Sequence, residues 1–159
     1  MIFSKSIRTF FPFALAVGVA SAVADSLTQM SVHHWYVRLV KPTWTAPPQI
    51  FGPVWTVLYA AMALAGWLIY RKEGWATAQK PLSLWGTQLI LNALWPGFFF
   101  ALRNPLLGTI EIVILMGFVF ATTVSFARRD RTATLLMVPY CIWITYAAAL
   151  TIAVWLMNR

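Results

Sequence analysis

The sequence predicts an all-α integral membrane protein, folded as a bundle of five transmembrane helices. Of its 159 residues, 60% are hydrophobic and only 10% are charged, and the mean hydropathy is +0.72. A soluble domain of this size needs more polar surface than that. A helix that spans a bilayer needs roughly 20 apolar residues, and the chain has five such stretches joined by short polar connections. We therefore expect one membrane domain over residues 1–159.

The first predicted helix covers residues 9–27. Its basic start, apolar middle and Ala22-Val23-Ala24 end are also typical of a cleavable signal peptide. Small residues at every fourth position give a second explanation, because they let two helices approach closely in lipid. This row consists of Ala14, Gly18 and Ala22. We favour a retained first span.

Four more helices follow, at residues 51–70, 81–102, 105–127 and 132–157. The pair Pro47-Pro48 precedes the second, as proline is preferred at a helix start. In the third helix, Pro96 frees a backbone carbonyl in the middle of the bundle. The same helix carries a second row of small residues, which we predict as a homodimer face: Ala93, Gly97 and Ala101.

Basic residues lie almost wholly in the connections, so the net charge of +8 indicates membrane topology and not nucleic-acid binding. Eight lysines and arginines fall on the side of the N-terminus and four on the other side. The positive-inside rule then places the N-terminus in the cytoplasm. We expect the membrane to be a bacterial cell membrane. The long first connection, residues 28–50, would face the outside.

Ordinary enzyme chemistry has little support in the sequence. It contains no glycine-rich phosphate loop, no metal-ligand spacing and no nucleophile with a partnered base. His33 and His34 are adjacent, so they cannot share a helix face, and we interpret them as interfacial residues in preference to haem-iron ligands. The single cysteine, Cys141, lies in an apolar stretch and is interpreted as a structural thiol.

Polar side chains inside the apolar stretches are more informative, because each is costly in lipid unless it faces a partner or a cavity. Gln88, Asn92 and Trp95 follow at helical spacing on one face. This face either forms hydrogen bonds to a neighbouring helix or is the wall of a pocket. Glu111 is expected to have a partner, to face water or to be protonated. Other aromatics inside the stretches would complete a flat pocket for a large planar ligand: Trp55, Tyr59, Trp143 and Tyr146.

One stretch, residues 35–59, holds five tryptophans and tyrosines and four prolines, and it begins a series of motifs that identify a family. The motifs are Trp35-Tyr36, Lys41-Pro42-Thr43-Trp44-Thr45-Ala46-Pro47-Pro48, Phe51-Gly52-Pro53-Val54-Trp55, Leu58-Tyr59, Gln88-Leu89, Leu91-Asn92, Trp95-Pro96, Phe98-Phe99, Pro139-Tyr140 and Trp143. In their order and spacing the chain resembles the TspO/MBR family over nearly its whole length. This family comprises the tryptophan-rich sensory proteins and the translocator proteins, or peripheral benzodiazepine receptors.

The resemblance implies a five-helix bundle, often a homodimer, whose first long connection acts as a lid over a ligand pocket. It implies porphyrins such as protoporphyrin IX or haem as ligands, with no obligatory cofactor and no metal site. Carried over by position, the ligand-binding residues would be Tyr36, Trp44, Trp55, Tyr59, Asn92, Trp95, Trp143 and Ala147. Two alternatives stay open beside a binding and sensing role. One is light- or oxygen-dependent porphyrin breakdown, with Trp55 or Trp143 as the candidate catalytic residue, and the other is translocation of cholesterol or another small lipid.

Two departures from the family pattern bear on these expectations. Where relatives carry Leu-Asn and an aromatic residue as part of a sterol-recognition motif, this chain has Leu150-Thr151-Ile152, which puts cholesterol recognition in doubt. Where many relatives carry an aspartate in the fourth helix, this chain keeps an acid as Glu111.

Overall fold

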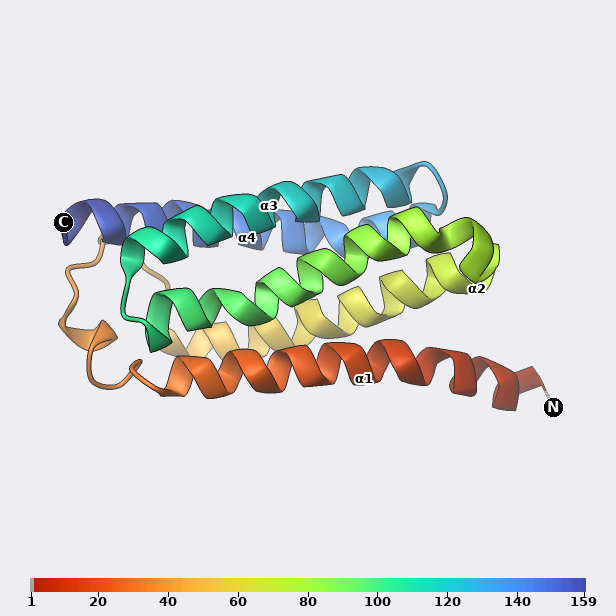
Figure 1. Ribbon diagram of the computed structural model, residues 1–159, viewed down its shortest axis with the longest axis horizontal. Helices are drawn as coiled ribbons and strands as arrows, with labels where there is room; N and C mark the ends of the chain where they lie inside the picture. Colours follow the sequence, from red (N-terminus) through yellow and green to blue (C-terminus); the bar gives the residue numbers. More distant parts are fainter. Residues whose placement is uncertain (1) are drawn as a thin grey trace.

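Four α-helices lie side by side along the long axis of the molecule (Figure 1). The structure is a computed structural model that describes the backbone of residues 2–159 and the side chains of residues 8–159. The helices are α1 (Ile2–Gln29), α2 (Pro48–Pro96), α3 (Pro105–Ala127) and α4 (Arg131–Met157). Two short helical turns accompany them: a 3₁₀ turn, η1 (Tyr36–Arg38), and a π-helical turn, η2 (Gly97–Ala101), that continues α2.

The expectation of five separate helices is not supported. The predicted second and third helices, residues 51–70 and 81–102, belong mainly to a single element, α2, which reverses direction at Gly74 (Figure 1). Gly74 has a φ of 71° and a ψ of 171°, a conformation that a residue without Cβ adopts at no steric cost. Because one glycine makes the reversal, the polar residues on both sides stay helical. The two limbs of α2, residues 48–73 and 75–96, then pack against each other.

Ion pairs tie this reversal to the connection between α3 and α4. Lys72 lies 3.5 Å from the carboxylate of Asp130, and Nε of Arg129 lies 3.1 Å from that of Glu73. The Asp130 carboxylate also caps α4 by accepting a hydrogen bond of 2.9 Å from the Ala133 N–H. This bond, together with the Lys72 ammonium, holds the pKa of the Asp130 carboxyl below its ordinary value. One end of the bundle is thereby fixed electrostatically.

By length and composition, four helices of the described chain are suited to cross a membrane: Arg8–Gln29, Pro48–Ala101, Pro105–Ala127 and Arg131–Met157. Their outward surfaces are apolar. Large exposed hydrophobic side chains occur on every one, among them Leu15, Val57, Ile110 and Ile142. Lipid tails can cover such a surface, whereas water would leave it as one large apolar patch.

Close packing of α1 on both limbs of α2 depends on one glycine. Trp85, on the second limb, donates its indole N–H to the carbonyl of Met62 on the first limb at 3.0 Å, and its ring lies 5.4 Å from that of Phe13 on α1. A Cβ on Gly66 would lie only 2.8 Å from the Trp85 ring and 3.1 Å from that of Phe13. There is no room for a side chain at this three-way contact.

Gly66→Ala is therefore expected to destabilise the bundle by about 1–3 kcal/mol, because the tryptophan ring has to move. Thermal unfolding of the detergent-solubilised protein should show a melting temperature several degrees lower. Gly86→Ala is the matched control, since no heavy atom lies within 4 Å of a Cβ at that position. Equal melting temperatures for the two variants would contradict the packing described here.

Candidate functional site

A chain of hydrogen bonds joins both limbs of α2 to α4 in the interior of the bundle. The Tyr59 hydroxyl donates to Oδ1 of Asn92 at 2.5 Å, and Nδ2 of Asn92 donates to the Tyr140 hydroxyl at 2.7 Å. All three side chains are buried. The side-chain amide of Asn92 thus serves one tyrosine as acceptor and the other as donor, which fixes the orientation of both rings.

Trp55 covers this hydrogen-bonded chain on the side of the long connection. Its ring centroid lies 5.4 Å from that of Tyr59 at an interplanar angle of 33°, and 6.1 Å from that of Tyr140. Trp55 precedes Tyr59 by one helical turn, so their side chains point the same way. The predicted neighbours Trp55, Tyr59 and Asn92 therefore lie together.

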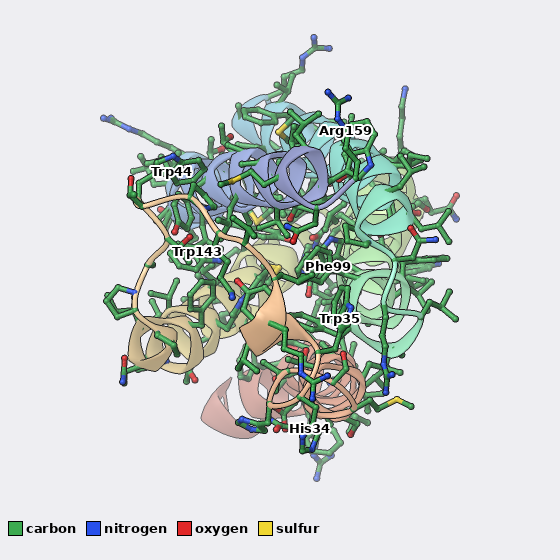
Figure 2. The ribbon with its side chains drawn as sticks, turned by 90° about the vertical axis from the view of Figure 1, so that its left-hand side faces the viewer. His34, Trp35, Trp44, Phe99, Trp143 and Arg159 are labelled. Atoms are coloured by element: carbon green, nitrogen blue, oxygen red, sulfur yellow. The ribbon has the colours of Figure 1, made fainter. Side chains whose placement is uncertain are left out.

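Aromatic packing continues from here to the surface through Trp143 of α4. Its ring lies 5.5 Å from that of Phe51 and 5.3 Å from that of Tyr146. Tyr146 in turn contacts the exposed ring of Trp44 at 6.0 Å. We call the group Phe51, Trp55, Tyr59, Tyr140, Trp143 and Tyr146 the aromatic cluster. Figure 2, which looks along the bundle, shows Trp44 and Trp143 on the same side of the molecule.

Residues 35–48, which we call the lid, cross one end of the bundle (Figure 2) and are held at two points. The Ala46 N–H donates to the Tyr146 hydroxyl at 2.7 Å. The side chain of Asn158 accepts from the Val40 N–H and donates to the Val40 carbonyl, both at 2.9 Å. The lid is therefore fastened to the C-terminal part of α4 through both its backbone and a ring contact.

Two ionisable side chains of the lid lie against each other. The ammonium of Lys41 is 4.7 Å from the centre of the Tyr36 ring and donates to the carbonyl of Leu39 at 2.8 Å. Burial raises the pKa of the Tyr36 phenol, and the neighbouring Tyr146 raises it further. Burial lowers the pKa of Lys41. The Lys41 side chain therefore lies over the face of a phenol ring whose pKa is raised.

Tyr36 and Trp95, two of the predicted ligand-binding residues, belong to a second group of rings. Trp95 stacks on Phe99 at 5.2 Å and donates its indole N–H to the carbonyl of Gly108 at 3.0 Å. Tyr36 lies 5.4 Å from Phe100. The π-helical turn η2 places Phe99 and Phe100 side by side, at 4.9 Å. The predicted site thus divides into the aromatic cluster and a neighbouring group under the start of the lid.

Three buried polar groups among the described side chains have no hydrogen-bond partner. They are the indole N–H of Trp143, Oε1 of Gln88 and both carboxyl oxygens of Glu111. Ala147, one turn after Trp143, is partly buried against the core. A buried donor without a partner is uncommon, and it marks a place where a ligand or a water molecule can bind. Trp143 puts such a donor next to the rings of Phe51 and Tyr146.

Other predicted residues lie away from the aromatic cluster. Gly97 faces α1 of the same chain, because a Cβ there would lie 3.5 Å from the side chain of Leu27. The row Ala93, Gly97 and Ala101 stays a prediction as a dimer face. His33 and His34 are both exposed, and the described side chains contain no group of three or more potential metal ligands.

Sequence reasoning did not assign the roles of Phe51 and Tyr140. Tyr140 accepts the second hydrogen bond of the Asn92 side chain. Its position three residues before Trp143, on the same helix face, could have indicated that it belongs to the site. Phe51 was interpreted as the start of a helix, although its ring packs on Trp143. That contact depends on how α2 and α4 cross, which no local pattern encodes.

These features define a helical membrane protein with an aromatic, lid-covered site. Comparison with known proteins agrees: the model of the TspO/MBR family matches residues 10–156. The chain is 35% identical to the tryptophan-rich protein TspO of Chlorobaculum tepidum over 95% of its own length and 98% of that protein. It is 37% identical to the TspO of Archaeoglobus fulgidus over 91% of each chain, and 33% identical to the human translocator protein over 92% of this chain and 88% of that one.

The chain belongs to the TspO/MBR family. It is an integral membrane protein, as its apolar helices and its relatives agree. The resemblance inferred from the motifs is confirmed over almost the whole chain.

The hydrogen bonds from Asn92 to Tyr59 and Tyr140 can be tested by measuring stability. Asn92→Leu leaves two buried tyrosine hydroxyls without their shared partner, so we expect it to lower the free energy of unfolding by about 1–2 kcal/mol. Combining it with Tyr59→Phe and Tyr140→Phe removes those hydroxyls and should recover part of the loss. A triple variant less stable than Asn92→Leu, measured by denaturation in detergent, would show that the hydrogen bonds contribute little.

The fastening of the lid can be tested at Asn158. Asn158→Ala removes both bonds to Val40, so hydrogen exchange of the Val40 amide should become about fivefold faster, as expected for a loss near 1 kcal/mol. Asn158→Asp keeps an acceptor for that amide but loses the donor to the Val40 carbonyl, so its exchange should lie between those of the alanine variant and the unmodified protein. Unchanged exchange in the alanine variant would mean that the lid is held elsewhere.

Proposed function

We propose that the aromatic cluster and the lid bind a porphyrin or a similar large planar ligand, and that the protein acts as a membrane sensor or translocator for it. Family membership supports the sensor or translocator role, since relatives carry the names tryptophan-rich sensory protein and translocator protein. The observation that supports this ligand is the buried indole N–H of Trp143, a donor without a partner whose ring packs against those of Tyr146 and Phe51.

The geometry supports a flat ligand with an acceptor at its edge. Faces of Trp55, Trp143 and Tyr146 supply stacking surface, and the Trp143 N–H could donate to a carboxylate or carbonyl of the ligand. In this structure the rings contact one another at 5.3–6.1 Å between neighbours. A porphyrin would therefore have to enter by displacing the lid and separating the rings of the cluster.

The same proposal includes the membrane arrangement. Each limb of α2 has more than the roughly 20 residues that a crossing needs, so we propose that the chain crosses the bilayer five times. Eight of its twelve lysines and arginines lie at the end that holds the start of α1, the Gly74 reversal and the α3–α4 connection (Figure 1). This end would be cytoplasmic, and the lid would face the opposite side.

Titration of the purified protein with protoporphyrin IX in the dark, followed by quenching of tryptophan fluorescence, tests the ligand. We expect saturable binding that Trp143→Phe weakens by about tenfold, because this substitution keeps a ring but removes the unpartnered donor. Trp75→Phe is the matched control, as Trp75 is exposed at the other end of the bundle. Equal affinity in the two variants would contradict the assigned site.

Illumination of the same samples separates binding from light-dependent breakdown. In the breakdown reaction, Trp55 or Trp143 would donate an electron to the photoexcited porphyrin, and dissolved dioxygen would be the oxidant that opens the ring. Porphyrin absorbance would then fall in the light, with a defined product, and the fall would slow in Trp55→Phe. Stable absorbance under light would leave binding as the function of the site.

A further inference from the structure

The two halves of the lid are held by different parts of the molecule. Residues 35–41 are anchored by aromatic rings that pack against η2 and by Asn158, which makes two hydrogen bonds to Val40. We call residues 42–46 the flap. Among the residues that the structure describes, hydrogen bonds from the flap to other parts of the chain all go to Tyr146. The flap can therefore be released while the first half of the lid stays in place.

Internal hydrogen bonds make the flap a compact turn. Thr45 donates its backbone N–H to the carbonyl of Pro42 at 3.1 Å and its hydroxyl to the same carbonyl at 2.7 Å. Prolines restrict the backbone at both ends of the turn, since Pro42 begins it and Pro47 follows it. A turn closed on itself in this way moves as one piece when its contact with the bundle is broken.

Tyr146 of α4 makes that contact. Its hydroxyl accepts a hydrogen bond of 2.7 Å from the Ala46 N–H, which we call the latch, and it lies 3.4 Å from the carbonyl of Trp44. Its ring lies 6.0 Å from the Trp44 ring and 5.3 Å from that of Trp143. One side chain therefore belongs to the aromatic cluster and also holds the flap.

A flat ligand that enters between Trp143 and Tyr146 cannot leave the latch intact. Stacked planes lie about 3.5 Å apart, so such a ligand needs roughly 7 Å between the two rings, which are 5.3 Å apart. Trp143 is backed by Phe51 at 5.5 Å and by the core. Tyr146 is backed by Trp44, which is 50% exposed. The Tyr146 ring has the room to move, and a shift of about 2 Å breaks the latch.

We propose that the latch is an autoinhibitory contact, so that a planar ligand in the aromatic cluster and a closed flap exclude each other. This inference rests on the proposed function, because it concerns the same ligand at the same site. Ligand binding displaces Tyr146 and releases the flap, while Asn158 still holds Val40. The latch lowers the apparent affinity, because the free protein is mostly in the closed state. Occupancy of the buried site thereby changes the outer surface of the lid.

Tyr146→Phe tests the latch by affinity, since it keeps the ring and removes only the hydroxyl. In the dark titration with protoporphyrin IX, this variant should bind about fivefold more tightly than the unmodified protein, as expected for losing one hydrogen bond that only the free protein makes. A hydroxyl that contacted the ligand would have the opposite effect. Tyr70→Phe is the matched control, because it makes the same change near the Gly74 reversal and should bind like the unmodified protein.

Hydrogen exchange of two lid amides gives an independent measurement. Without ligand, Tyr146→Phe should accelerate exchange of the Ala46 amide about fivefold and leave that of Val40 unchanged, because Asn158 holds Val40. Saturating protoporphyrin IX should likewise accelerate exchange at Ala46 and not at Val40 in the unmodified protein.

The outcomes separate this inference from the proposed function. Equal or weaker porphyrin binding by Tyr146→Phe would overturn the latch and leave the proposed function standing. Unchanged Ala46 exchange in the ligand-free variant, or slower Ala46 exchange in the porphyrin complex, would do the same. Absence of saturable porphyrin binding by the unmodified protein would overturn both.

Discussion

A polar side chain in the middle of a lipid-embedded bundle has to find its hydrogen-bond partners within the protein, and the site depends on how Asn92 meets this constraint. Its amide joins Tyr59 on the first limb of α2 to Tyr140 on α4. These bonds set the rotation of three helical segments about their axes. The ring of Trp55 contacts both tyrosines, so its position depends on the same amide. Polar pairing in the interior thus determines where the aromatic faces point.

The class of the protein could be predicted from the sequence because it depends on composition and length. Apolar stretches of about 20 residues have few stable solutions other than membrane helices. The junction of the second and third helices could not be predicted in this way. A stretch of charged and polar residues, such as Arg71 to Glu73, is typical of a loop, but it stays helical here because Gly74 alone turns the chain.

Prediction of the site succeeded and failed for a related reason. Residues one turn apart on one helix, such as Trp55 and Tyr59, were expected to lie together, and they do. Contacts between elements depend on crossing angles that local spacing does not contain. Tyr36 and Trp95 were assigned to the predicted pocket because they match positions in the family motifs. In the structure they pack against Phe99 and Phe100 instead. The π-helical turn after Pro96, which brings these two rings together, leaves no periodic signature in the sequence.

The contact between Asn158 and Val40 has a practical consequence for work with this protein. The residue that holds the lid lies next to Arg159, so an affinity tag or fluorescent protein fused after Arg159 would begin beside the lid. α1 begins at the opposite end of the bundle (Figure 1). A tag placed before α1 therefore lies at the far end of the bundle from the lid. Ligand affinities measured with tags at the two ends are not interchangeable until the C-terminal tag has been removed.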